Sequence, residues 1–110
     1  MKIKINEKEV ELKFNFKTEL IYEEIAKASF DGQTTTSWIN LFYSSVVANG
    51  GDGVATYKEF IDWLNQNPDV FYDFIAWHTE TMASISSLTR LTADAEKKAK
   101  GTTGGKKKTS

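Results

Sequence analysis

Thr56–Leu88, TYKEFIDWLNQNPDVFYDFIAWHTETMASISSL, decides the fold and holds seven of the chain's fourteen aromatic residues. Thr56 and Glu59 have the spacing of a capping box, in which each side chain satisfies a backbone N–H at a helix start. Asn67 is a good N-cap, and Pro68 suits the first helical position because its missing N–H costs nothing there. The stretch therefore predicts two consecutive helices.

We expect these helices to span about 57–66 and 68–90. Apolar residues recur at helical spacing in the second one, and their arc is wider than contact with one neighbouring helix requires. The residues of this arc are Phe71, Phe74, Ile75, His78, Met82 and Ile85. The second helix is therefore predicted to supply the core.

The first sixteen residues carry strand patterns. Glu9–Phe16 alternates polar and apolar residues at every step, and residues 2–5 alternate in the same way. The polar segment Asn6–Lys8 between them favours a turn. We therefore predict a β-hairpin over residues 2–16, which must lie on the helices because an isolated hairpin is marginally stable.

Two further helices are expected between the hairpin and Thr56. The first is predicted over about 18–29, with Ile21, Ile25 and Ala28 as its buried stripe. The second is predicted over about 36–48, within a segment, Gln33–Gly51, that carries no charge. A helix with apolar residues on every side is usually buried.

Two interpretations of the 36–48 helix remain open at this stage. It is either central and covered by the hairpin, or it leaves part of its surface exposed as a partner site. Aromatic residues are favoured at the centres of interfaces, with core packing as the alternative for each. The candidate partner-binding residues are Trp38, Phe42, Tyr43, Val47 and Trp77.

The predicted fold class is α+β: an N-terminal two-stranded hairpin packed on a bundle of about four helices. Residues 1–92 form a single globular domain in this interpretation. Residues 93–110 have lysines but no apolar stripe, so we expect a disordered or frayed-helical basic tail.

Charge is divided unevenly along the chain. Residues 1–88 carry 13 acidic and 7 basic side chains, a net charge of −6, whereas residues 89–110 carry 2 acidic and 7 basic, a net charge of +5. An acidic body is a poor platform for nucleic acid, so we expect no specific nucleic-acid partner. No apolar signal-peptide segment or membrane span is apparent, so we expect a cytoplasmic protein.

The sequence offers little reactive chemistry. There is no cysteine, and His78 is the single histidine, set in the middle of an apolar stripe. A lone histidine there is more often a core residue than a ligand, and no phosphate-binding loop or nucleophile motif appears. We therefore expect no enzyme activity, no metal and no cofactor.

The segment Ile3–Phe14, IKINEKEVELKF, followed by Phe16 and Lys17, resembles the start of small tail assembly chaperones of long-tailed, siphovirus-like phages. The likeness extends in general layout over residues 1–90: a hairpin, a helical body and a lysine-bearing end. It implies that the chain binds the tape measure protein, and as a further partner the tail tube protein, in the cytoplasm of the infected bacterial host.

The family also extends some copies by a −1 frameshift near the stop codon. Lys106–Lys108 must be encoded by an A-rich run on which such slippage could occur; a solubilising tail is the alternative. Two other functional classes remain open. One is a structural tail or head–tail component that self-associates, and the other is a small protein-binding adaptor or inhibitor.

Overall fold

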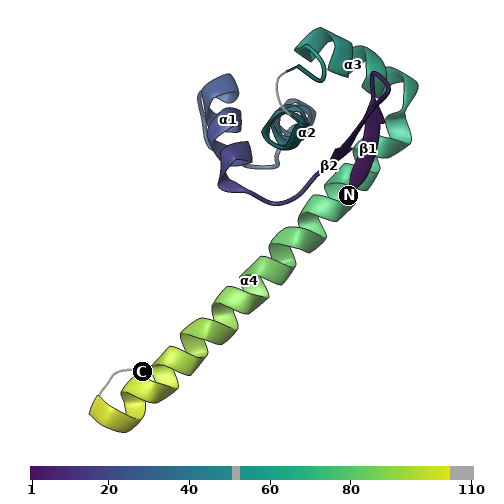
Figure 1. Ribbon diagram of the computed structural model, residues 1–110. Helices are drawn as coiled ribbons and strands as arrows, with labels where there is room; N and C mark the ends of the chain where they lie inside the picture. The colour runs from purple at the N-terminus through teal and green to yellow at the C-terminus, as the bar shows by residue number, and fades with distance from the viewer. Residues whose placement is uncertain (51–52, 105–110) are drawn as a thin grey trace. The chain divides into compact units, whose positions relative to one another are not determined.

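The computed structural model contains an N-terminal hairpin followed by four helices, as Figure 1 shows. It describes residues 1–50 and 53–104, with side chains as far as residue 87. The elements are β1 (Lys2–Ile5), β2 (Lys8–Glu11), α1 (Phe16–Ala26), α2 (Thr35–Gly50), α3 (Tyr57–Gln66) and α4 (Pro68–Gly104). The predicted α+β class is confirmed.

The hairpin is closed by a two-residue turn. Ile5 pairs with Lys8, which leaves Asn6 and Glu7 between the strands with φ of 51° and 63°. Two consecutive positive φ values are characteristic of a type I′ turn, whose twist matches that of paired strands. Asn6 also anchors the turn, because its Nδ2 donates to the carbonyl of Val54 at 3.0 Å.

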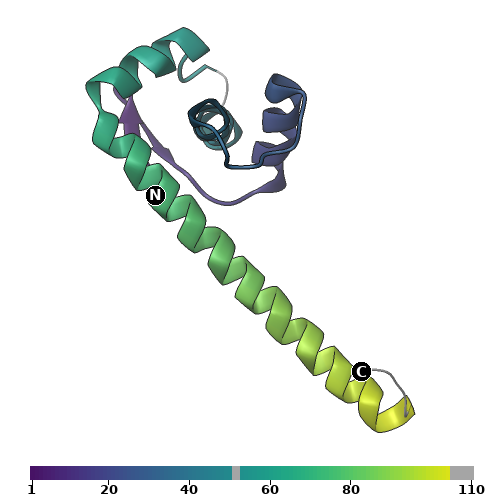
Figure 2. The same ribbon diagram turned by 180° about the vertical axis from the view of Figure 1, so that it is seen from behind.

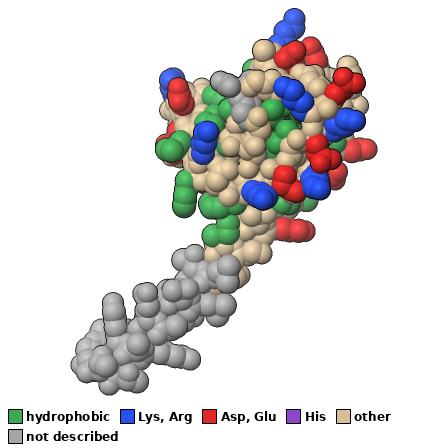
Figure 3. All heavy atoms as spheres, in the orientation of Figure 1, with side chains coloured by type: hydrophobic (Ala, Val, Ile, Leu, Met, Phe, Trp, Pro, Cys, Tyr) green, Lys and Arg blue, Asp and Glu red, His purple; other side chains and the backbone are tan. Residues whose placement is uncertain are grey.

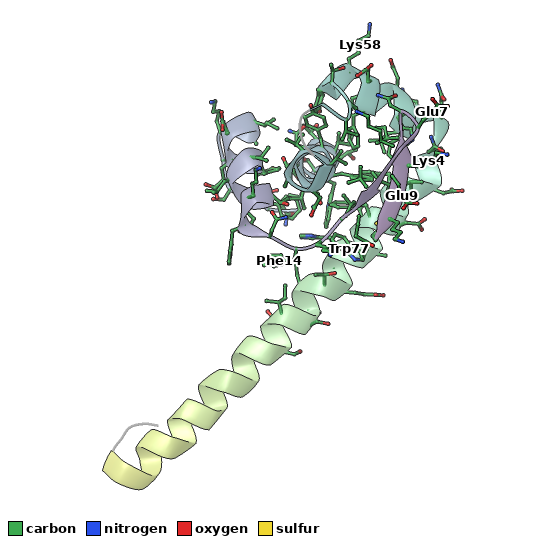
Figure 4. The ribbon with its side chains drawn as sticks, viewed as in Figure 1. Lys4, Glu7, Glu9, Phe14, Lys58 and Trp77 are labelled. Atoms are coloured by element: carbon green, nitrogen blue, oxygen red, sulfur yellow. The ribbon has the colours of Figure 1, made fainter. Side chains whose placement is uncertain are left out.

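The two faces of the hairpin differ as the alternation predicted. Ile3, Ile5 and Val10 are buried. Lys4 and Glu9 are register partners and lie on the outer face, as Figure 4 shows. The hairpin therefore covers the core with one face and is exposed on the other.

The predicted extension of the second strand to Phe16 is wrong. β2 ends at Glu11, and Asn15 caps a helix by accepting a hydrogen bond at Oδ1 from the N–H of Thr18 at 2.9 Å. An asparagine cap needs an extended residue followed at once by helix, so the alternation stops there. Phe16 becomes the first residue of α1 and is 71% exposed.

The predicted buried stripe of the first helix is wrong at two of its three residues; Ile21 is half-buried. α1 spans Phe16–Ala26 instead of 18–29, so Ala28 lies beyond it and is exposed, and Ile25 is 40% exposed. Tyr22 is buried in their place, because its ring packs edge-on against Phe30, 5.5 Å between centroids. An aromatic side chain buries more area than an isoleucine, so the helix turns its Tyr22 side inward.

α2 is the central helix. In Figures 1 and 2 it lies between α1 on one side and the hairpin and α3 on the other. It runs over Thr35–Gly50, slightly longer than the predicted 36–48, and Leu41, Phe42 and Val46 on it are fully buried. The interpretation of a central, covered helix is the one that the structure supports.

α3 and α4 begin where the sequence predicted. In the capping box at Thr56, Glu59 N–H donates to the Thr56 hydroxyl at 3.2 Å, and Thr56 N–H donates to the Glu59 carboxylate at 2.8 Å. The bounds of α3 equal the predicted 57–66, and α4 begins at Pro68. α4 continues to Gly104, past the predicted end at 90.

The chain divides into two compact units, Met1–Trp77 and a second that begins at His78 within α4. The first unit contains the hairpin, α1, α2, α3 and the start of α4.

The predicted tail is helical where the structure describes it, because residues 93–104 belong to α4. Residues 105–110, which include Lys106–Lys108, lie outside the described residues. Within the described part, no helix is long and apolar enough to cross a membrane.

Candidate partner-binding surface

Phe42, the predicted anchor at the middle of α2, is a core residue. Its side chain is 0% exposed and stacks on Phe74, with ring centroids 4.3 Å apart and an interplanar angle of 4°. Phe60 and Trp63 meet it edge-on, at 5.1 and 6.0 Å. A partner could not reach this ring without opening the core, so the expectation of a surface anchor here is corrected.

Tyr43 is half-buried and holds the loop before α3 in place. Its hydroxyl donates to the carbonyl of Ala55 at 3.1 Å, and its ring packs against Tyr57 and Phe60, 5.3 and 5.4 Å between centroids. The hydroxyl of Tyr57 in turn donates to the side chain of Asn40 at 2.8 Å. These contacts give Tyr43 a structural role.

The other three predicted anchors are half-buried. Trp38 donates its indole N–H to the carbonyl of Gly32 at 3.2 Å and packs edge-on against Phe30, 4.9 Å between centroids. Trp77 lies beside Phe74 at 5.9 Å and is labelled in Figure 4 at the start of α4. The structure thus gathers Trp38, Phe42 and Trp77 around Phe74, as a core. Val47, the last of the predicted anchors, is a half-buried residue of α2.

Among the side chains that the structure describes, exposed apolar residues are concentrated on α1. Five large hydrophobic residues are exposed in that part of the chain, and three of them belong to this helix: Phe16 (71%), Leu20 (67%) and Ile25 (40%). In Figure 3 hydrophobic side chains project at the left edge, where α1 lies in Figure 1. The other two are Tyr57, engaged by Asn40, and Tyr72 on α4.

Phe16 and Leu20 form one patch, because residues four apart lie on the same side of a helix. Phe14, half-buried in the segment before α1, extends it with an edge-on contact to Phe16, 5.4 Å between centroids; Figure 4 labels it. Ile25 lies about half a turn round the helix from Phe16 and is separate. We call Phe14, Phe16 and Leu20 the α1 outer face.

This surface was not predicted from the sequence, because the alternation from Glu9 was extended through Phe16. The signal that could have revealed it is Asn15, a preferred N-cap residue. A helix that begins at residue 16 has Phe16 and Leu20 one turn apart. It also leaves Glu19 in the first turn, where a negative charge favours the helix dipole.

Polar groups in the described region serve packing. Every buried side-chain nitrogen or oxygen atom there has a hydrogen-bond partner, and no group of three or more acidic or histidine side chains is placed to hold a metal ion. His78, half-buried on α4, has its pKa lowered by desolvation. This favours the neutral imidazole at physiological pH.

Comparisons of the chain with protein families, with curated proteins and with solved structures found no match.

Proposed function

We propose that this chain is a tail assembly chaperone of a long-tailed phage, which binds the tape measure protein and keeps it soluble while the tail tube assembles. The observation that supports the proposal is the α1 outer face, with Phe16 and Leu20 about two-thirds exposed or more. A chaperone for a long helical chain needs an apolar surface on which one side of a helix can be buried. The mode of action is binding, without catalysis or a cofactor.

The resemblance and the surface overlap in the sequence. The segment that resembles these chaperones runs from Ile3 to Lys17, and two of the three residues of the α1 outer face, Phe14 and Phe16, lie within it. The proposal includes the host cytoplasm as the location. It also includes the tail tube protein as a second partner and a longer product made by a −1 frameshift. The nucleotide sequence tests the frameshift.

A self-associating structural component is supported less well. Addition of a neighbour's strand would use the hairpin, whose strands are only four residues long. The outer-face side chains Lys2, Lys4, Glu9 and Glu11 are charged and exposed. Short, charged edges oppose strand addition.

Co-expression tests the proposed function. The chain is produced together with the tape measure protein encoded in the same genome, and the soluble fraction of that protein is measured. We expect a large increase over expression without the chain. No increase with a folded chain present would refute the proposal.

A matched pair of variants locates the binding surface. Leu20→Gln removes an apolar side chain from the α1 outer face, and Tyr72→Gln removes one of equal exposure, 67%, from α4. We expect the first to lower the soluble fraction and the second to leave it unchanged. Equal effects would mean that the α1 outer face is not the site.

A further inference from the structure

The α1 outer face is held rigidly by the elements around it. Asn49 on α2 donates from Nδ2 to the carbonyl of Lys13 at 3.3 Å, and Asn15 donates from Nδ2 to Asn49 Oδ1 at the same distance. Asn15 itself caps α1 through the N–H of Thr18. The short segment Lys13–Asn15, which carries Phe14 and leads into Phe16, is therefore hydrogen-bonded to α2 at both of its ends. A preformed surface loses little conformational entropy on binding.

Carboxylates border the apolar pair. At about 100° per residue, Glu23 lies about 20° to one side of Phe16, and Glu24 lies about 40° beyond Leu20 on the other side. Both are exposed, as is Glu19 one turn earlier. α1 itself carries one exposed cation against these three carboxylates: Lys17 lies about 60° beyond Leu20, as far from the apolar pair as Glu19 is on the other side. Lys13 precedes Phe14, and Lys27 follows the helix end.

We infer that the α1 outer face takes a cationic amphipathic helix, whose apolar residues cover Phe16 and Leu20 while lysines or arginines beside them meet Glu19, Glu23 and Glu24. The inference rests on the proposed function and adds the chemistry of the bound segment. Exposed ion pairs contribute little affinity each, but they select the sign of the partner's charge and its orientation. The net charge of −6 over residues 1–88 is also opposite in sign to that of such a segment.

A second copy of this chain fits the surface less well. Its α1 would bring the same carboxylates against Glu23 and Glu24, and like charges in contact oppose association. Two or three side chains per copy also bury far less than the roughly 1,200 Å² of a stable interface. A basic helix laid along α1 instead meets those carboxylates with charges of the opposite sign.

The test uses the full chain and two fluorescent 18-residue helical peptides with the same leucine spacing, one with lysine and one with glutamate at the polar positions. Fluorescence anisotropy at physiological salt gives the dissociation constants. We expect the lysine peptide to bind at least about tenfold more tightly than the glutamate peptide, a difference of about 1.4 kcal/mol. Equal affinities would overturn the inference and leave the co-expression result untouched.

Two matched variants separate the α1 outer face from general attraction by an acidic protein. Glu19→Gln, Glu23→Gln and Glu24→Gln together remove three charges beside the face, and Glu7→Gln, Glu9→Gln and Asp62→Asn remove three exposed charges elsewhere. We expect the first triple variant to weaken binding of the lysine peptide about tenfold and the second to weaken it less than about threefold. Equal losses would refute a site on α1.

The contribution of the apolar side chains of the α1 outer face is tested by comparing Leu20→Gln with Tyr72→Gln. Circular dichroism confirms that both variants fold. Only the first should weaken the lysine peptide. Sedimentation of the free chain tests whether a second copy occupies the face instead. A dimer that Leu20→Gln abolishes would assign the face to a second copy and overturn the inference.

Discussion

Replacing Phe74 by alanine should remove a large part of the stability of the fold. The ring is 0% exposed, stacks flat on Phe42 at 4.3 Å, and meets Trp38 and Trp77 at 6.4 and 5.9 Å between centroids. Truncation of a buried phenylalanine to alanine costs about 3–5 kcal/mol, and three rings around one site collapse poorly into the space left. We therefore expect a loss near the upper end, about 4–5 kcal/mol, against a total of about 5–15 kcal/mol.

The control lies two residues away on the same helix. Tyr72 is 67% exposed, so Tyr72→Ala should change the free energy of unfolding by no more than about 0.5 kcal/mol. Urea unfolding followed by circular dichroism measures both variants. A loss below about 2 kcal/mol for Phe74→Ala, or similar losses for the two variants, would refute the central position assigned to Phe74.

Three further predictions concern the backbone and pH. Glu7→Gly should stabilise the hairpin by about 0.5–1 kcal/mol in urea unfolding, because Glu7 has a φ of 63°, which glycine adopts without strain; a loss of stability would contradict the type I′ turn. Gly50→Ala should destabilise by about 1–2 kcal/mol, since a Cβ there would lie 2.9 and 3.0 Å from methyl groups of the stiff side chains Val54 and Val10; a gain, as helix propensity alone predicts, would contradict the close packing. Desolvation lowers the pKa of His78, so the unfolded chain takes up a proton first and stability should fall as pH drops below about 6.5. His78→Gln should flatten that fall in unfolding measured from pH 7.5 to 5.5, and an unchanged slope would contradict the shift.

Much of the architecture follows from local signals in the sequence. Thr56 and Glu59 fix the start of α3, and Pro68 fixes the start of α4, because each depends on a few neighbouring backbone groups. The alternation of Ile3, Ile5 and Val10 placed the hairpin for the same reason. Such features need no knowledge of the tertiary structure.

The surface could not be predicted in the same way, because exposure depends on which elements compete to cover a helix. An uncharged α2 is compatible with either a core or a partner site, and Phe42 became core only because Phe60 and Phe74 reach it from other elements. For Phe16 the error runs in the opposite direction, from predicted burial to observed exposure. Its place in an alternating pattern predicted burial, and a cap at Asn15 left it exposed.

Site-specific photocrosslinking can show whether the tape measure protein binds at the α1 outer face. A benzophenone amino acid is placed at the position of Leu20 in one variant and of Tyr72 in another, two positions of equal exposure. Each variant is co-expressed with the tape measure protein of the same genome and irradiated in the cell. We expect an adduct with the tape measure protein from position 20 and none from position 72. An adduct from position 72 alone, or a soluble tape measure protein with no adduct from position 20, would contradict binding at this face.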